Sequence, residues 1–171
     1  MLTRALRAAR LDGEIYKAIV DEPQSIIDAL FIVIVVAVSF GVGMRDQPIN
    51  DLQDSQASLI LMAFSTILVG WVLWATVIYL IGTWALGGKA THRTLLRATG
   101  VAYGPGVLMV LIGVPFVGDG FFAASLVWLL ATVTVAVRET QGFTMRRAAM
   151  STVTGWILAH WILRVLILQP A

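Results

Sequence analysis

Long stretches without a charged residue constrain this chain more than any other feature of its sequence. Five stretches contain no Asp, Glu, Lys or Arg: Ala29–Met44, Ser55–Gly88, Ala98–Gly118, Gly120–Val137 and Ala148–Leu163. A helix needs roughly 17–25 mainly apolar residues to cross the hydrocarbon core of a bilayer, and these stretches are of about that length. The sequence therefore predicts a polytopic membrane protein.

The composition argues against the other common classes of protein. Of the 171 residues, 58% are hydrophobic and only 13% are charged, whereas about a quarter of a soluble domain is charged. Disordered chains and nucleic-acid-binding modules need still more charge, so we expect no nucleic-acid partner. The chain has no cysteine, which excludes disulfides, zinc–thiolate sites and iron–sulfur clusters.

We expect an all-α fold, a transmembrane bundle of five helices, because a backbone in lipid must satisfy its own hydrogen bonds. The predicted spans lie near 26–44, 58–84, 98–117, 121–138 and 148–168. Residues 25–171 would then form one membrane domain, preceded by a short segment of residues 1–24.

The second and third spans are unusual. The apolar run Ala57–Leu86 would be about 45 Å long as one helix, against a hydrocarbon core of about 30 Å. It is either one helix that tilts or extends past the membrane, which the absence of proline favours, or two re-entrant pieces broken near Gly70. Pro105 predicts a kinked, internal third helix, because proline removes a backbone donor. A tight turn at 118–120 would join the third span to the fourth in a helical hairpin.

The basic residues predict the orientation. Ten of the twelve Lys and Arg residues lie before the first span, between the second and third, or between the fourth and fifth. Positively charged loops remain cytoplasmic, so the N-terminus is expected inside the cell and the C-terminus outside.

The N-terminal segment, residues 1–24, is amphipathic. Leu11, Ile15, Ala18 and Ile19 share one face of a helix, and charged residues share another. We expect a helix lying on the cytoplasmic leaflet, with a docking helix for a partner protein as the alternative.

Two ionisable residues of the fifth span are candidate contacts with a partner or with lipid. Arg164 lies about 24 Å along that helix from Ala148, where its side chain can reach the outer boundary or bind a partner or a lipid phosphate. His160, one turn earlier, is a structural residue or a haem or metal ligand, but a second histidine within the membrane is missing. No acidic residue lies mid-span and no catalytic constellation occurs, so we expect no catalytic residue, metal or cofactor.

Small residues spaced four apart indicate close helix packing. Ser151, Gly155 and Ala159 form such a row in the fifth span, and Gly100 and Gly104 form one in the third. These rows are either a face for a protein partner or packing surfaces within the bundle.

Glycine-rich motifs support a family resemblance. The segment Gly87-Gly88-Lys89-Ala90-Thr91 is followed by Leu95-Leu96 and then by Gly100-Val101-Ala102-Tyr103-Gly104-Pro105. This pattern resembles the bacterial branch of the Yip family, which is named in eukaryotes for its interaction with Rab-type GTPases. The resemblance marks Gly88, Lys89, Tyr103 and Pro105 as family-defining, without a reaction. The Asp-Leu-Tyr-Gly-Pro motif of eukaryotic members is absent, so the resemblance does not extend to Rab-type binding.

The resemblance implies a non-enzymatic membrane organiser or adaptor, located in the bacterial inner membrane. It would act through contacts with membrane lipids and with a membrane-protein partner or a second copy. One alternative is an accessory subunit of a larger, energy-converting membrane complex. Another is a small transporter or channel, which would require a hydrated path between the helices.

Overall fold

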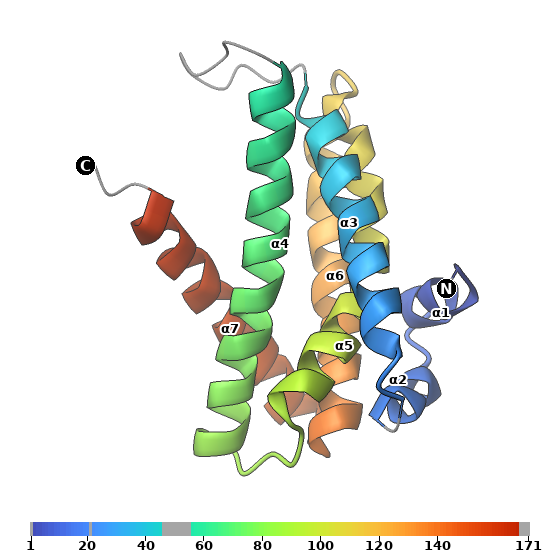
Figure 1. Cartoon of the computed structure of the whole chain (residues 1–171), viewed down its shortest axis with the longest axis vertical. Helices are drawn as coiled ribbons and strands as arrows, with labels where there is room; N and C mark the ends of the chain where they lie inside the picture. The colour runs from blue at the N-terminus through green and yellow to red at the C-terminus, as the bar shows by residue number, and fades with distance from the viewer. Residues whose placement is uncertain (1, 21, 46–55, 168–171) are drawn as a thin grey trace.

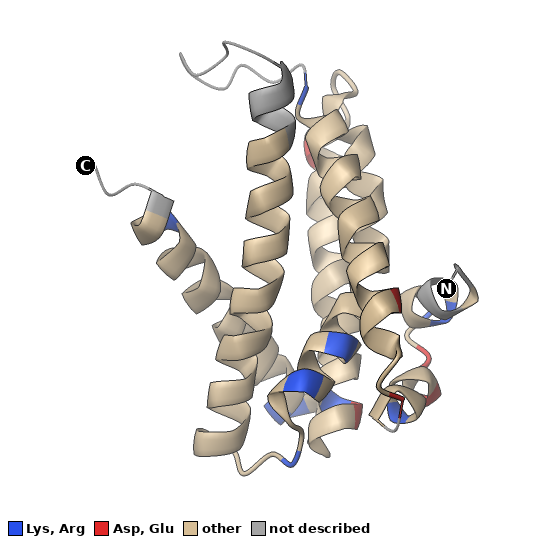
Figure 2. Cartoon of the chain, viewed as in Figure 1, with Lys and Arg blue, Asp and Glu red and all other residues tan. Residues whose placement is uncertain are grey.

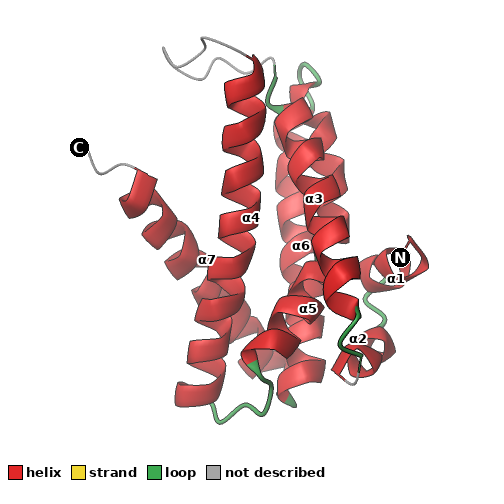
Figure 3. Ribbon diagram, viewed as in Figure 1, coloured by secondary structure: helices red, strands yellow, loops and turns green. Residues whose placement is uncertain are grey.

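The structure, a computed structural model, describes residues 2–20, 22–45 and 56–167. All regular structure in these ranges is helical, as Figure 3 shows. The α-helices are α1 (Leu2–Ala9), α2 (Gly13–Val20), α3 (Ser25–Gly43), α4 (Gln56–Leu80), α5 (His92–Ala102), α6 (Gly118–Gln141) and α7 (Met145–Ile167). A π-helical turn, η1 (Ile81–Ala85), continues α4, and a 3-10 helix, η2 (Gly104–Gly113), follows α5.

Four of the described helices are long and apolar enough to cross a membrane: α3, α4 with η1, α6 and α7. The pair α5 and η2 passes the same test together, although the two are bent by 47° relative to each other, and it would make a fifth span. The expectation of an all-α, multi-span membrane fold is therefore confirmed.

The second span is one helix. The α-helix α4 runs through Gly70 without a break and continues into η1 up to Ala85. Together they cover 56–85, so the one-helix interpretation is confirmed and the re-entrant alternative is wrong.

The third span differs from the kinked α-helix expected for 98–117. The α-helical part begins earlier, at His92, and ends at Ala102. From Gly104 onward the chain winds as a 3-10 helix, in which the N–H of Gly106 donates to the carbonyl of Tyr103 at 2.8 Å. Because Pro105 has no N–H to donate, the α-helical ladder cannot continue through it, and tighter winding replaces a simple kink.

The hairpin between η2 and α6 exists, but its turn lies earlier than expected. Residues 114–117 form the turn, and Gly118 already begins α6. Gly118 packs directly against the backbone carbonyl of Ile112, where a side chain would not fit. The predicted turn at 118–120 is therefore wrong by a few residues.

The bundle packs around α3, α4, η2 and α6, and α5 crosses one end of it (Figure 1). Its core includes Trp74, Ile78, Leu95, Val101 and Val133, all at most 1% exposed. The helix α7 begins beside α4 and α6 and diverges from α4 toward its C-terminal end (Figure 1). That end carries several exposed apolar side chains, such as Trp161 and Leu166.

The N-terminal segment forms two helices, so the expectation of one amphipathic helix is wrong. The chain breaks at Leu11, which has a positive φ of 61° and is exposed. Asp12 then caps α2 by accepting a hydrogen bond from the N–H of Glu14 at 3.1 Å. Ile15 and Ile19 are buried, and α2 packs against α5 and α6, so the apolar face of this helix is covered by protein.

Candidate functional site

Most of the basic residues lie at one end of the bundle, which we call the basic end (Figure 2). It comprises α2, the loop 86–91 after η1, the start of α5 and the turn between α6 and α7. Its exposed basic residues are Lys17, Lys89, Arg93, Arg138, Arg146 and Arg147. The motif Gly87-Gly88-Lys89 lies at this end, so the basic end is the candidate functional site.

A buried glutamine holds the Gly-Gly-Lys loop in place. Gln141, at the end of α6, is 2% exposed, and its side-chain oxygen accepts a hydrogen bond from the N–H of Ala90 at 3.2 Å. Gly82 and Gly88 lie against this side chain so closely that a Cβ atom at either would overlap it. The N–H of Gly88 in turn donates to the carbonyl of Gly82 at 2.8 Å. The loop is therefore a fixed part of the structure.

The two glycines of the motif serve different needs. Gly87 has a positive φ of 68° with open space around it, so backbone conformation selects glycine there. Gly88 is selected by the close approach of Gln141 and of the Phe143 ring, whose Cζ would lie 2.9 Å from an added Cβ. Lys89 follows them and is exposed, so the loop presents its charge outward.

Replacing Gly88 by alanine is expected to lower the free energy of unfolding by about 1–2 kcal/mol, because Gln141 must move and its bond to Ala90 weakens. Thermal unfolding of the purified protein in detergent measures the change. Gly70→Ala is the matched control. An added Cβ at Gly70 meets nothing within 4 Å, so that substitution should raise stability by up to about 1 kcal/mol. Equal stability of Gly88→Ala and the natural protein would contradict the clamp.

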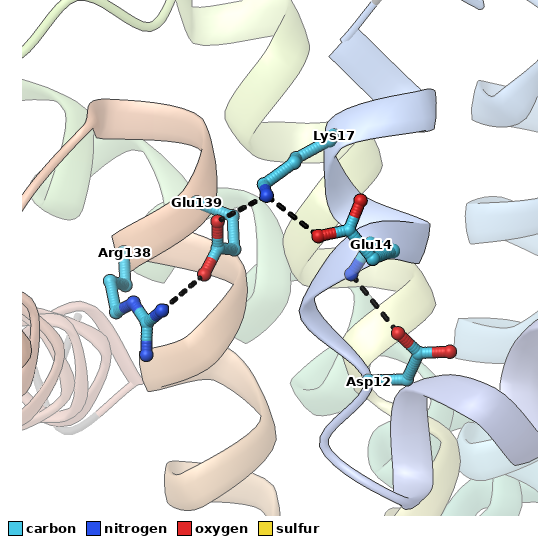
Figure 4. Close-up of polar contacts among 5 residues, drawn as sticks. All are labelled: Asp12, Glu14, Lys17, Arg138 and Glu139. Atoms are coloured by element: carbon cyan, nitrogen blue, oxygen red, sulfur yellow. Dashed lines mark hydrogen bonds and ion pairs between the residues drawn. The ribbon is translucent and has the colours of Figure 1, made fainter.

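An ion-pair network ties α2 to the end of α6 (Figure 4). Lys17 Nζ lies 2.7 Å from Glu14 Oε1 and 3.9 Å from Glu139 Oε2. Arg138 Nη2 lies 2.9 Å from the other oxygen of Glu139, whose side chain is only 11% exposed. The hydrogen bond to Glu14 raises the pKa of Lys17. These contacts dock the N-terminal segment on the bundle at the basic end.

Tyr16 anchors the same contact from the apolar side. It is fully buried, and its hydroxyl group has no hydrogen-bond partner in the described part of the chain. Burial raises the pKa of this hydroxyl group well above its usual range. No motif in the sequence marks Tyr16, Glu139 or Gln141. A polar residue at the end of a span gives no signal in a hydropathy pattern of where its side chain lies.

Gly100 is a helix-packing residue within the chain. A Cβ at this position would lie 2.6 Å from the Cβ of Ala29 on α3 and 2.9 Å from the ring of Trp71 on α4. Nearby, the ring N–H of Trp71 donates to the hydroxyl of Thr99 at 3.1 Å. Gly100 thus lets α5 approach α3 and α4 together.

Tyr103, Gly104 and Pro105 mark the change from α5 to η2. Tyr103 is 5% exposed and meets Trp74 edge to face, with ring centroids 6.0 Å apart. Its ring also lines a cavity of about 260 Å³ between α3, α4, η2, α6 and α7. Gly104 and Pro105 line a separate, almost wholly apolar groove of about 420 Å³ that runs beneath α1.

The row Ser151, Gly155 and Ala159 is buried within the described chain. A Cβ at Gly155 would lie 2.8 Å from Cγ1 of Ile78 on α4. Trp74 on α4 donates its ring N–H to the carbonyl of Thr152 at 3.1 Å. This face of α7 therefore packs against α4.

His160 and Arg164 are exposed on the diverging half of α7. The Nδ1 atom of His160 lies 2.9 Å from the carbonyl oxygen of Trp156, and the two rings are 4.3 Å apart. His160 also lines the cavity that Tyr103 borders. These two residues are not brought together with the Gly-Gly-Lys loop.

The other histidine, His92, joins α5 to α4. Its Nε2 atom lies 2.9 Å from the hydroxyl of Thr76, and its ring meets that of Tyr79 edge to face at 5.6 Å. His92 is the first residue of α5.

No cluster of three His, Asp or Glu side chains suited to a metal ion occurs among the described residues. Within the same residues, every buried polar side chain is Ser, Thr or Gln, apart from the tyrosines. The arrangement offers fixed surfaces and close helix contacts.

Comparison with known proteins places the chain in a family. No curated protein and no solved structure matches it. The family model described as the Yip1 domain matches residues 12–166, which include α2, the Gly-Gly-Lys loop and nearly all of the bundle. The chain therefore belongs to the Yip1 domain family, whose members are generally non-enzymatic integral membrane proteins.

Proposed function

We propose that this Yip1-domain protein is a membrane adaptor that presents its basic end to a protein partner on the cytoplasmic side of a bacterial inner membrane. The observation that carries the proposal is the fixed Gly-Gly-Lys loop. Gln141 and Ala90 hold it from within, while Lys89 is exposed and Trp84, just before the loop, is 82% exposed. Tryptophan is among the residues that contribute most of the binding energy at protein interfaces, and here it lies exposed beside a rigid loop.

Helix lengths support a position of this loop outside the hydrocarbon core. Ala29, Trp71 and Gly100 lie at one level of the bundle. From this level α3 and α4 extend about 21 and 22 Å toward the end of the bundle opposite the basic end, and α4 with η1 extends about 21 Å toward the basic end. A hydrocarbon core about 30 Å thick that starts at the end opposite the basic end would stop about 8 Å beyond Gly100, on the side of the basic end. Trp84 and Lys89 then lie beyond it.

The charge distribution supports the orientation. Positively charged segments remain cytoplasmic, and most of the exposed basic residues of the described chain gather at the basic end (Figure 2). The end opposite carries Arg45 and Asp119. A reporter fused after residue 171 that is active only in the cytoplasm would contradict this orientation.

The alternatives rest on other features. The accessory-subunit alternative draws on the exposed half of α7, which includes Trp161 at 65% exposure. The transporter alternative draws on the 260 Å³ cavity, whose lining is mainly apolar. No Asp, Glu, Lys or Arg is buried in the ranges that the structure describes, and an ion or proton pathway normally has one. We therefore favour the adaptor.

Photo-crosslinking in native membranes tests the proposal. A photoreactive amino acid at position 84 is expected to give one predominant protein adduct, either a partner or a second copy. The same amino acid at Val127, which is 68% exposed on α6, should give lipid adducts alone. Identical adducts from the two positions would contradict the adaptor role. If the protein instead co-purifies with several other subunits at fixed stoichiometry, bound through α7, it is an accessory subunit of a larger complex.

A further inference from the structure

A groove of about 550 Å³ lies at the basic end, between the start of α3 and α5. Its walls combine two chemistries. Arg93, Arg97 and the hydroxyl-bearing Thr91 contribute polar groups, and Pro23, Ile26 and Leu96 contribute apolar side chains.

Both arginines have guanidinium hydrogen-bond donors that the folded chain does not use. None of the ion pairs or side-chain hydrogen bonds found in the described part of the chain involves the exposed guanidinium group of Arg93. Arg97 is partly committed. Its Nε donates to the carbonyl of Arg93 at 3.3 Å, and its Nη2 donates to Thr94 Oγ1 at 3.3 Å and to the carbonyl of Val20 at 3.5 Å. The two donors of Nη1 remain available. Two adjacent guanidinium groups without a carboxylate partner are suited to a phosphate.

The groove also lies at the right depth. Arg97 and Arg93 precede Gly100 by about 4.5 and 10 Å along α5. Because α5 is inclined to the bundle and bent by 47° from η2, both residues lie close to the boundary of the hydrocarbon core, which falls about 8 Å past Gly100. Ile26 is 39% exposed and Leu30, one turn further into the core on the same face of α3, is 44% exposed. An acyl chain can follow this apolar face while its phosphate remains between the arginines.

We propose that this groove binds an anionic phospholipid, with the phosphate held by Arg93 and Arg97 and an acyl chain lying along Ile26 and Leu30. The apolar wall and the depth favour a lipid over an acidic peptide, which would need polar partners on both sides. The inference rests on insertion in a membrane and is independent of the adaptor role.

Native mass spectrometry of the full-length protein, titrated with phosphatidylglycerol in a neutral detergent, tests the proposal. The double variant Arg93→Gln/Arg97→Gln is expected to bind the first phosphatidylglycerol roughly thirtyfold more weakly, about fivefold per arginine. Arg93→Gln alone should lose about fivefold, and it breaks no hydrogen bond of the folded chain. Phosphatidylcholine should bind weakly to all forms.

The matched control is Arg146→Gln/Arg147→Gln, which removes the same charge from exposed positions on α7. It should change the affinity less than about twofold, because those arginines lie outside the groove. Equal losses in the two double variants would mean diffuse charge attraction and would overturn the site. Equal binding of phosphatidylcholine, or displacement of the lipid by an acidic peptide at similar concentration, would overturn it as well. The crosslinking experiment at position 84 tests the adaptor role separately, so either proposal can fail without the other.

Discussion

Replacing Trp74 by alanine is expected to lower the free energy of unfolding by about 3–5 kcal/mol. Trp74 is 1% exposed, and it joins α4 to α7 through the hydrogen bond to the Thr152 carbonyl and to α5 through the Tyr103 ring. Lipid tails are as apolar as the core, so the loss comes from packing and from the lost hydrogen bond between helices rather than from hydrophobic transfer. Unfolding of the purified protein in a mixed-micelle titration with a denaturing detergent, followed by circular dichroism, measures it.

Tyr103→Phe is the control for this prediction. It keeps the edge-to-face ring contact and removes a hydroxyl group for which no hydrogen bond is found among the described residues. Its stability should match that of the natural protein within about 0.5 kcal/mol. A Trp74→Ala protein that unfolds at the same detergent fraction as Tyr103→Phe would show that Trp74 does not hold α4, α5 and α7 together.

Replacing Gly100 by alanine is expected to cost about 3 kcal/mol, at the upper end of the range for overpacking. The added methyl group would meet the methyl of Ala29, which has no rotamer to change, and the ring of Trp71 on the other side. The helices α3 and α5 must therefore separate. Loss of a disulfide crosslink engineered between these two helices, together with a lower unfolding midpoint, would report the separation.

The control for Gly100→Ala is Gly120→Ala in the first turn of α6. An added Cβ there meets nothing within 4 Å, so helix propensity predicts unchanged or slightly higher stability. If both alanine variants are equally stable, the close approach of α5 to α3 and α4 is not a requirement of the fold.

Much of the fold was predictable because hydropathy and charge act locally. The spans near 26–44, 121–138 and 148–168 agree with α3, α6 and α7 to within a few residues. The absence of proline correctly predicted one unbroken helix in α4. Pro105 correctly marked an interruption, but the change to 3-10 winding depends on how Tyr103 and Gly106 bond around it, which no local pattern specifies.

The candidate site was less predictable. The family motif drew attention to Gly88, Lys89 and Tyr103, but not to the side chains that contact them. Gln141 lies 53 positions after Gly88 in the sequence and Trp74 lies 29 before Tyr103. Pairing of such distant residues follows from the order in which helices pack, and a single sequence carries no direct signal of it.

The sequence by itself determined that this chain is an all-α membrane protein, because charge-free stretches of span length have no other stable environment. It also determined where the basic residues lie along the chain. Only the tertiary structure decided that α2 covers its apolar face with α5 and α6, that Gln141 fixes the Gly-Gly-Lys loop, and that Arg93 and Arg97 share a groove with Ile26. The physical reason is that burial and pairing of side chains depend on contacts between distant segments, whereas helix formation in lipid depends on neighbouring residues alone.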